Sequence, residues 1–164
     1  MSIYAKIGSV SSGTFVPRDL AWAFHFDLKK LAEQDTEDAE RKKRTLDALE
    51  PIGALLKQEA NETPEATAVF DTFHQETAPE LFEAYCAPFT SFGSHPGDGA
   101  DFGIWPDVES AQEQARYRDG VVSVPAGDEW PELEDDIDYV LEVNDHGNVS
   151  LYNAHTKQPL WDCV

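Results

Sequence analysis

The segment of residues 93–103, GSHPGDGADFG, contains the side chains whose types and spacing come closest to a metal site. His95, Asp98 and Asp101 offer imidazole nitrogen and carboxylate oxygen, the donor atoms that divalent cations accept. Asp107 or His146 could complete the set, and the glycines would let the backbone wrap an ion. A metal-dependent enzyme centred on this segment is therefore one hypothesis for the function.

Two other interpretations of the same segment are a phosphate-binding loop and a tight turn. A phosphate-binding loop requires a G-x-x-x-x-G-K pattern, whereas residues 58–115 contain no Lys or Arg at all. The spacing also matches neither the calcium-loop pattern nor a zinc pattern with a second close His or Cys. A tight turn is favoured, in which Pro96 fixes the entry and Gly97 and Gly99 adopt left-handed or otherwise strained dihedral angles. No metal ligand and no cofactor are assigned.

Other catalytic patterns find little support. The G-x-S-x-G pattern of a serine nucleophile is absent, and Cys86 and Cys163 are too far apart for a Cys-x-x-Cys site. We interpret both cysteines as reduced thiols. With 32 Asp and Glu in the chain, some close pair of carboxylates is inevitable and does not indicate a glycosidase. No catalytic residue is assigned, and a non-catalytic protein is favoured.

Charge is distributed unevenly along the 164 residues, whose formal net charge is −20. Residues 1–57 contain nine basic and nine acidic residues, whereas residues 58–164 contain three basic and 23 acidic residues. Solubility or adaptation to high salt would lower the basic content throughout, so neither explains a neutral first third. An acidic surface repels nucleic acid and anionic membranes and attracts basic proteins. The expected partner is a basic protein, in particular one that binds nucleic acid.

Acid is densest within residues 125–138, where a loop is expected. Exposed aromatic side chains there could provide short-range anchors for a partner. The candidate partner-binding residues are Glu129, Trp130, Glu132, Glu134, Asp135, Asp136 and Asp138, together with Trp105. The alternative is a loop that is only solvated.

Basic residues cluster at one place, residues 41–44, where acidic residues flank them. On a helix, Glu37 and Arg41, Asp38 and Lys42, and Glu40 and Arg44 would each be four residues apart. We therefore expect a solvated helix whose charges pair with one another.

Helices are expected in the first half of the chain. Residues 3–10 predict a short strand, and Pro17 begins a helix over residues 18–34 whose apolar stripe is widened by Trp22 and Phe26. A second helix runs to Glu50 and is kinked or ended by Pro51. Thr63 caps a third helix, and a capping box at Thr77 opens a fourth, which Pro88 stops.

Strands dominate the second half. Residues 89–93 and 102–105 predict a hairpin around the glycine-rich segment, followed by a short helix over residues 108–117. Further strands are expected at residues 121–124, 139–143, 149–151 and 160–164. The pattern predicts one compact α+β domain over residues 1–164, helix-rich over 17–87 and strand-rich over 88–164, with helices packed on one face of a mostly antiparallel sheet.

Neither a targeting segment nor a run of about 18 apolar residues occurs, which predicts a protein of the cytoplasm. The stretches FGSHPGDGADFGIWPD, VNDHGNVSLY and LWDCV, within residues 89–164, resemble small uncharacterised acidic proteins of tailed bacteriophages and prophages. The resemblance carries no catalytic residues. It implies a phage-encoded inhibitor of host defence or of nucleic-acid machinery, acting in the host cytoplasm as a nucleic-acid mimic, or else a phage structural or assembly component.

Overall fold

The computed structural model describes residues 3–58 and 63–163 of the chain. The chain divides into two compact units. We call them the helical unit, Met1–Cys86 with Phe92–Trp105, and the sheet unit, Ala87–Ser91 with Pro106–Val164. The fold class is α+β, as predicted. Among the described residues, no helix combines the length and the apolar character that crossing a membrane requires.

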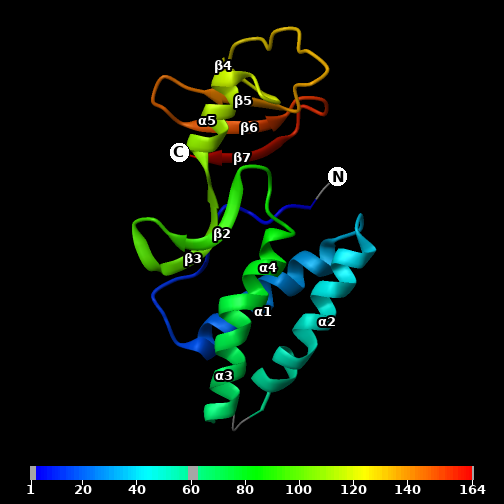
Figure 1. Ribbon diagram of the computed structural model, residues 1–164, viewed down its shortest axis with the longest axis vertical. Coiled ribbons are helices and arrows are strands. Elements are labelled where there is room, and N and C mark those ends of the chain that lie inside the picture. Colours follow the sequence, from blue (N-terminus) through cyan, green and yellow to red (C-terminus); the bar gives the residue numbers. More distant parts are fainter. Residues whose placement is uncertain (1–2, 59–62, 164) are drawn as a thin grey trace. The chain divides into compact units, whose positions relative to one another are not determined.

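Four α-helices and one π-helical turn build most of the helical unit (Figure 1). They are α1 (Pro17–Gln34), α2 (Ala39–Leu56), α3 (Pro64–Thr72), η1 (Phe73–Thr77) and α4 (Ala78–Glu83). Asp38 and Thr63 accept hydrogen bonds from the backbone amides of Arg41 and Ala66, so the starts of α2 and α3 are capped. The expected capping box at Thr77 is wrong, because η1 joins α3 and α4 and the Thr77 side chain caps nothing.

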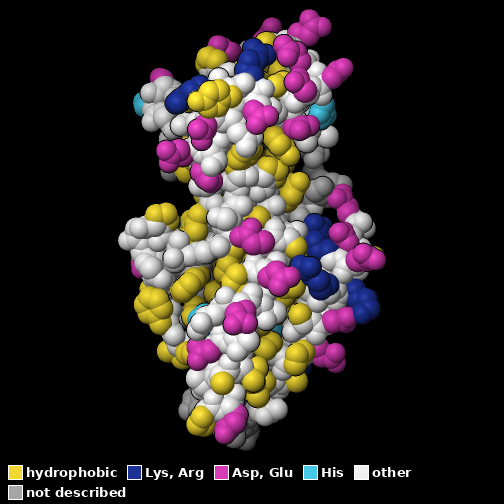
Figure 2. All heavy atoms as spheres, in the orientation of Figure 1, with side chains coloured by type: hydrophobic (Ala, Val, Ile, Leu, Met, Phe, Trp, Pro, Cys, Tyr) yellow, Lys and Arg dark blue, Asp and Glu magenta, His cyan; other side chains and the backbone are white. Residues whose placement is uncertain are grey.

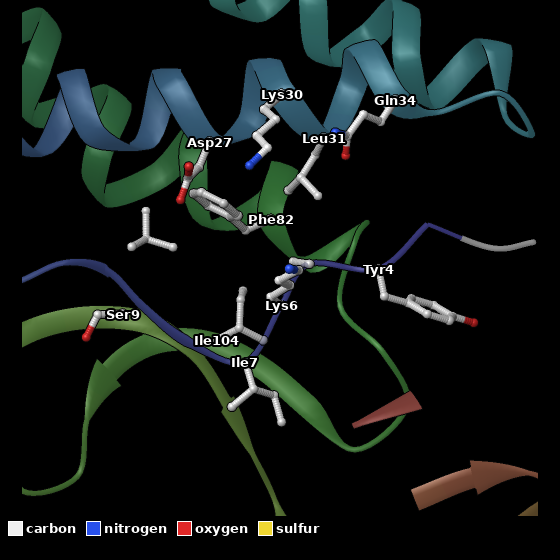
Figure 3. A pocket seen from close by; sticks show the side chains of 12 residues that line it. Tyr4, Lys6, Ile7, Ser9, Asp27, Lys30, Leu31, Gln34, Phe82 and Ile104 are labelled. Carbon is white, nitrogen blue, oxygen red and sulfur yellow. The ribbon is translucent and has the colours of Figure 1, made fainter. Parts of the chain in front are cut away.

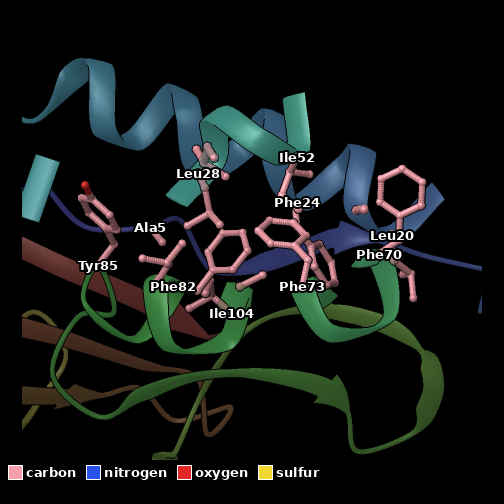
Figure 4. Close-up of a cluster of buried hydrophobic side chains, with 14 of the residues drawn as sticks. Ala5, Leu20, Phe24, Leu28, Ile52, Phe70, Phe73, Phe82, Tyr85 and Ile104 are labelled. Carbon is pink, nitrogen blue, oxygen red and sulfur yellow. The ribbon is translucent and has the colours of Figure 1, made fainter. Parts of the chain in front are cut away.

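An aromatic core lies beneath α1 (Figure 4). Phe24 of α1 makes edge-to-face contacts with Phe82 of α4 and with Phe92 and Phe102 of the sheet, at ring-centroid distances of 5.1–6.0 Å. Phe82 in turn stacks on Phe92 at 4.3 Å. Such pairs add to the hydrophobic stabilisation that burial already provides. The N-terminal helices are thereby held on the sheet, as the sequence predicts.

Three strands form that sheet in the order β1 (Gly8–Ser11), β3 (Asp98–Pro106) and β2 (Thr90–His95). β1 pairs antiparallel with β3, with Gly8 opposite Ile104. Strand β1 passes so close to Gly103 that a Cβ atom there would lie 2.2 Å from the carbonyl oxygen of Gly8. A side chain at position 103 is therefore incompatible with this pairing.

One expectation about α1 is wrong, and so is one of the two alternatives expected at Pro51. Trp22 and Phe26 do not widen the buried stripe of α1 but lie exposed on its outer face, stacked on each other at 5.8 Å. Pro51 does not end α2, which continues through it to Leu56. A single proline is tolerated because the helix is also held by the burial of Leu49 and Ile52 on either side of it.

Arg41 pairs with Asp35, which precedes α2. Its Nε donates to Asp35 Oδ2 at 2.7 Å, and its guanidinium lies 4.7 Å from the ring centre of Tyr85. The Asp35 side chain is fully buried and also accepts from the amides of Glu37 and Asp38. The hydrogen bond from Arg41, followed by those from the two amides, lowers the pKa of Asp35 to about 2.

In the sheet unit, four strands lie in the order β4 (Val121–Pro125), β5 (Tyr139–Val143), β6 (Val149–Asn153) and β7 (Pro159–Cys163). β4 and β5 are parallel, whereas β5, β6 and β7 are antiparallel neighbours. Helix α5 (Val108–Tyr117) packs against β4 and β5. Asp107 caps α5 by accepting from the Ser110 amide at 2.9 Å. The hydrogen bonds that it accepts from the amide and the side chain of Ser110 lower the pKa of Asp107.

Candidate functional site

The acidic loop, residues 126–138, connects the parallel strands β4 and β5 and is held on the sheet by its apolar side chains. Trp130, Leu133 and Ile137 join a small core with residues that include Val122 and Val140 of the strands beneath. Every third or fourth residue of the loop thus points toward the sheet. The residues between them must point outward, and most of these are acidic.

Backbone hydrogen bonds fix both ends of the acidic loop. At its start, the amide of Ala126 donates to the carbonyl oxygen of Val143 at 2.9 Å. At its end, the amide of Asp138 donates to Gly120 at 2.8 Å, and the carbonyl oxygen of Asp138 accepts from Ala154 at 2.8 Å. The loop therefore has no regular secondary structure but has a defined path.

All the carboxylates predicted to meet a partner are exposed on this loop. They are Glu129, Glu132, Glu134, Asp135, Asp136 and Asp138. Figure 2 shows acidic side chains over the surface of the sheet unit. The sheet unit as a whole has 14 acidic residues against three basic ones, a formal net charge of −11. Its electrostatic potential is therefore strongly negative, with the densest group of carboxylates on the loop.

One basic side chain and one histidine lie beside carboxylates of the loop. Arg118 Nη2 lies 3.8 Å from Glu134 Oε1, and His155 Nε2 lies 3.5 Å from Asp138 Oδ1. Both pairs are exposed, so water and salt weaken them. Glu129, Glu132, Asp135 and Asp136 take part in no ion pair among the residues that the structure describes. These contacts could not be found from the sequence, because no local spacing links residues 16 or more positions apart.

Trp130 anchors the loop to the sheet and is half-buried, which corrects the expectation of an exposed aromatic anchor. Its Nε1 donates to Glu142 Oε1 at 2.8 Å, and its ring meets that of Tyr152 at 5.6 Å. Lys157 Nζ lies 5.6 Å from the centre of the same ring. Burial raises the pKa of Tyr152, and the charge of Glu142 raises it further. The indole is therefore engaged in holding the fold.

Trp105, the second predicted anchor, belongs to the helical unit and not to the unit that carries the acidic loop. It is half-buried, its Nε1 donates to the carbonyl oxygen of Gly93 at 2.9 Å, and its ring lies 4.7 Å from that of His95. These contacts bind β3 to β2. Neither tryptophan is thus an exposed anchor of the kind that the sequence predicts.

His95, Asp98 and Asp101 each have a hydrogen-bond partner, and the three partners are different. His95 Nδ1 accepts from the Gly97 amide and Asp98 Oδ1 accepts from the Ala100 amide, both at 3.0 Å. Asp101 accepts from the hydroxyl of Ser9 across the β1–β3 pairing. No three His, Cys, Asp or Glu side chains within the described ranges gather as metal ligands. The turn is a tight hairpin turn, in which neither Gly97 nor Gly99 has the positive φ of the left-handed alternative.

The sequence matches no protein-family model, and no curated protein or solved structure is similar to it. The function therefore has to be argued from the residues of the chain itself.

Proposed function

We propose that this chain is a non-catalytic interaction protein whose acidic loop binds a basic surface of a partner protein. The observation that carries the proposal is the loop itself, on which six exposed carboxylates fall within ten residues and three apolar side chains hold the loop on a sheet. Because the loop is ordered before it meets a partner, little conformational entropy is lost on binding. Charge of one sign also accelerates the encounter with a basic partner.

The narrower form of the proposal is nucleic-acid mimicry. Duplex DNA carries about one negative charge per 1.7 Å of its axis, and an extended chain covers about 3.4 Å per residue. Six carboxylates over residues 129–138 are therefore sparser than the phosphates of a duplex and imitate part of that array. A groove that binds nucleic acid would be the complementary surface. A phage-encoded inhibitor of host defence or of nucleic-acid machinery would act in this way.

The two other hypotheses gain no support from the fold. A metal-dependent enzyme would need His95, Asp98 and Asp101 to converge, whereas each of the three side chains accepts a hydrogen bond from a different partner. A phage structural or assembly component would need a surface that binds further copies of the chain, and no feature of the described residues indicates such a surface. The partner-binding hypothesis is the one that a specific surface supports.

A pull-down with charge variants tests the proposal. The loop variant replaces the four carboxylates without described ion pairs by amides, namely Glu129→Gln, Glu132→Gln, Asp135→Asn and Asp136→Asn. The scattered variant, its matched control, carries the same change of charge at exposed positions elsewhere, namely Glu40→Gln, Glu50→Gln, Glu76→Gln and Glu113→Gln. Each protein is immobilised and exposed to bacterial lysate at about 50 mM and about 500 mM salt.

We expect a basic protein to be captured at low salt by the wild type and the scattered variant but not by the loop variant. Duplex DNA added to the complex should displace the chain if the captured surface is a nucleic-acid groove. Capture that is equal for both variants, or a captured protein that is acidic, would contradict the proposal. If capture is lost in the loop variant but duplex DNA does not displace the chain, the acidic loop binds the partner and the mimicry hypothesis is wrong.

A further inference from the structure

The helical unit contains a cavity of about 350 Å³ between α1 and residues 4–10 (Figure 3). Small-molecule sites in proteins begin at about this size. Residues 4–10 are fixed as one wall, because the Ala5 amide donates to the carbonyl oxygen of Tyr85 at 2.7 Å and β1 pairs with β3. The cavity is thus bounded by elements that are held in place by other contacts.

The inner part of the cavity is apolar. Phe82 of α4 and Ile104 of β3 lie beneath it, but each is only 1% exposed because it belongs to the core, so they offer a ligand almost no surface. Leu31 of α1 and Val10 of β1 are half-buried, pack against the same core and supply apolar surface that a ligand can reach. Core side chains are closely packed and keep their positions, so this apolar surface is preformed.

Three charged side chains surround the apolar part. Asp27 and Lys30 are three residues apart on α1 and extend from the same face of the helix toward residues 4–10, where Lys6 lies on the opposing wall (Figure 3). Two of the seven lysines of a chain with net charge −20 thus line one cavity. The cavity is a locally cationic place in an acidic protein.

The fold does not use these lysines. Within the described part of the chain, Lys6 and Lys30 take part in no hydrogen bond or ion pair of their own, whereas Lys29, Lys42 and Lys43 do. Burial raises the pKa of Asp27, and the charge of Lys30 acts in the opposite direction. An apolar pocket with a few charged groups at its rim is the usual form of a small-molecule site.

We propose that this cavity binds a small amphiphilic carboxylate, with the anionic group between Lys6 and Lys30 and the apolar body on Leu31 and Val10. Two positive charges and one negative charge leave the site with one uncompensated positive charge, which a monoanion neutralises. Asp27 disfavours a second anionic group and can accept a hydrogen bond from a ligand donor. The site is independent of the acidic loop, so either proposal can fail without the other.

Binding of three compounds of similar shape to the full chain tests the charge requirement. Phenylacetate, phenylacetamide and phenethylamine differ in being negative, neutral and positive, and amide chemical shifts of the ¹⁵N-labelled protein report both affinity and place. We expect phenylacetate to bind roughly tenfold more tightly than the other two, with shifts at residues that line the cavity. Equal affinity for the three, shifts confined to other surfaces, or no binding at about 10 mM would overturn the proposal.

Single substitutions in α1 then assign the charges. Lys30→Gln should weaken phenylacetate binding roughly tenfold, and Asp27→Asn should strengthen it because a repelling charge is removed. Lys29→Gln is the matched control, since it is adjacent, makes the same charge change and does not line the cavity. An effect of Lys29→Gln as large as that of Lys30→Gln would show a diffuse electrostatic effect and overturn the site. Lys6→Gln provides the same test from the opposite wall, should Lys30→Gln fail to fold.

Discussion

At the scale of single residues, the Asp35–Arg41 pair shows how one buried charge is tolerated. The carboxylate of Asp35 is removed from water, but it accepts three hydrogen bonds, one of them from a guanidinium. A buried charge is costly unless such partners replace the lost water. The pair ties the start of α2 to Tyr85 and to the carbonyl oxygen of Ala84, at the end of α4.

Replacing Asp35 by asparagine should destabilise the chain by about 1–3 kcal/mol at neutral pH, because the charge-assisted bond is lost. The pKa of Asp35 is about 2 in the folded chain and near 3.8 in the unfolded one. The stabilisation is therefore complete above about pH 4 and is lost as the pH falls toward 2. Urea unfolding of the wild type and Asp35→Asn at several pH values should show the difference narrowing over that range.

Asp47→Asn is the control for this experiment. Asp47 pairs with Lys43, but both side chains are exposed. Its replacement should change the free energy of unfolding little, because exposed pairs contribute little. If Asp47→Asn costs as much as Asp35→Asn, burial is not what gives the Asp35 pair its strength.

Gly103 allows β1 to pair with β3, because a Cβ there would lie 2.2 Å from Gly8 O and 2.9 Å from Ser9 Cα. Both are backbone atoms, so the strands would have to separate. Gly103→Ala should lower the free energy of unfolding by about 2 kcal/mol or more. Gly93→Ala, in β2, is the matched control, because no atom lies within 4 Å of its Cβ position. Equal effects of the two in thermal unfolding would contradict this account.

At the scale of elements, strong apolar periodicity and proline placement located most helices correctly. Pro17 begins α1 and Pro64 begins α3, as the sequence predicts. The exposure of Trp22 and Phe26 was not predictable, because a helical stripe of apolar residues does not tell which of its members meets a neighbouring helix. The π-helical turn η1 has no sequence signature either, so Thr77 and Glu80 were interpreted as a new helix start.

Because Pro51 lies inside α2, its replacement should stabilise the chain. Pro51 lacks the amide hydrogen that would bond within the helix, and it is exposed, so no core contact requires it. Pro51→Ala should therefore raise the free energy of unfolding by about 1–3 kcal/mol. Ala54→Gly, at a nearby exposed position of the same helix, should act in the opposite direction by about 1 kcal/mol. A lower thermal midpoint for Pro51→Ala would indicate that α2 needs a bend at this residue.

At the scale of the whole molecule, both units are acidic, but the smaller one is more densely so. The helical unit has a formal net charge of −9 and the sheet unit −11, although the latter contains only 64 of the 164 residues. Like charges at this density repel one another and oppose the compact state. Screening by salt should relieve this repulsion.

Unfolding should therefore depend on salt. Raising the salt concentration from about 20 mM to about 300 mM should raise the thermal midpoint of the wild type, because the Debye length shortens. The loop variant should show a smaller rise, since its four changed carboxylates lie close together. The scattered variant should retain more of the salt dependence, and an equal loss in both variants would show that the acidic loop is not a centre of repulsion.

The sequence predicts the acidic residues of the candidate site, but it does not predict the contacts that hold the acidic loop on the sheet. The exposure of the acidic residues of 129–138 follows from their chemistry. The burial of Trp130 does not, because its partners Glu142 and Tyr152 come from β5 and β6. The parallel pairing of β4 with β5 was also not foreseeable from alternation alone, which is the same for either direction.

That parallel pairing imposes a minimum length on the chain between the two strands. Parallel neighbouring strands begin at the same end of the sheet. The connection must therefore return along the whole length of β4 before β5 can begin. Substitutions at the outward positions of residues 126–138 leave this return path intact, whereas deletions shorten it. We infer that residues 126–138 tolerate substitutions at their outward positions but do not tolerate deletions.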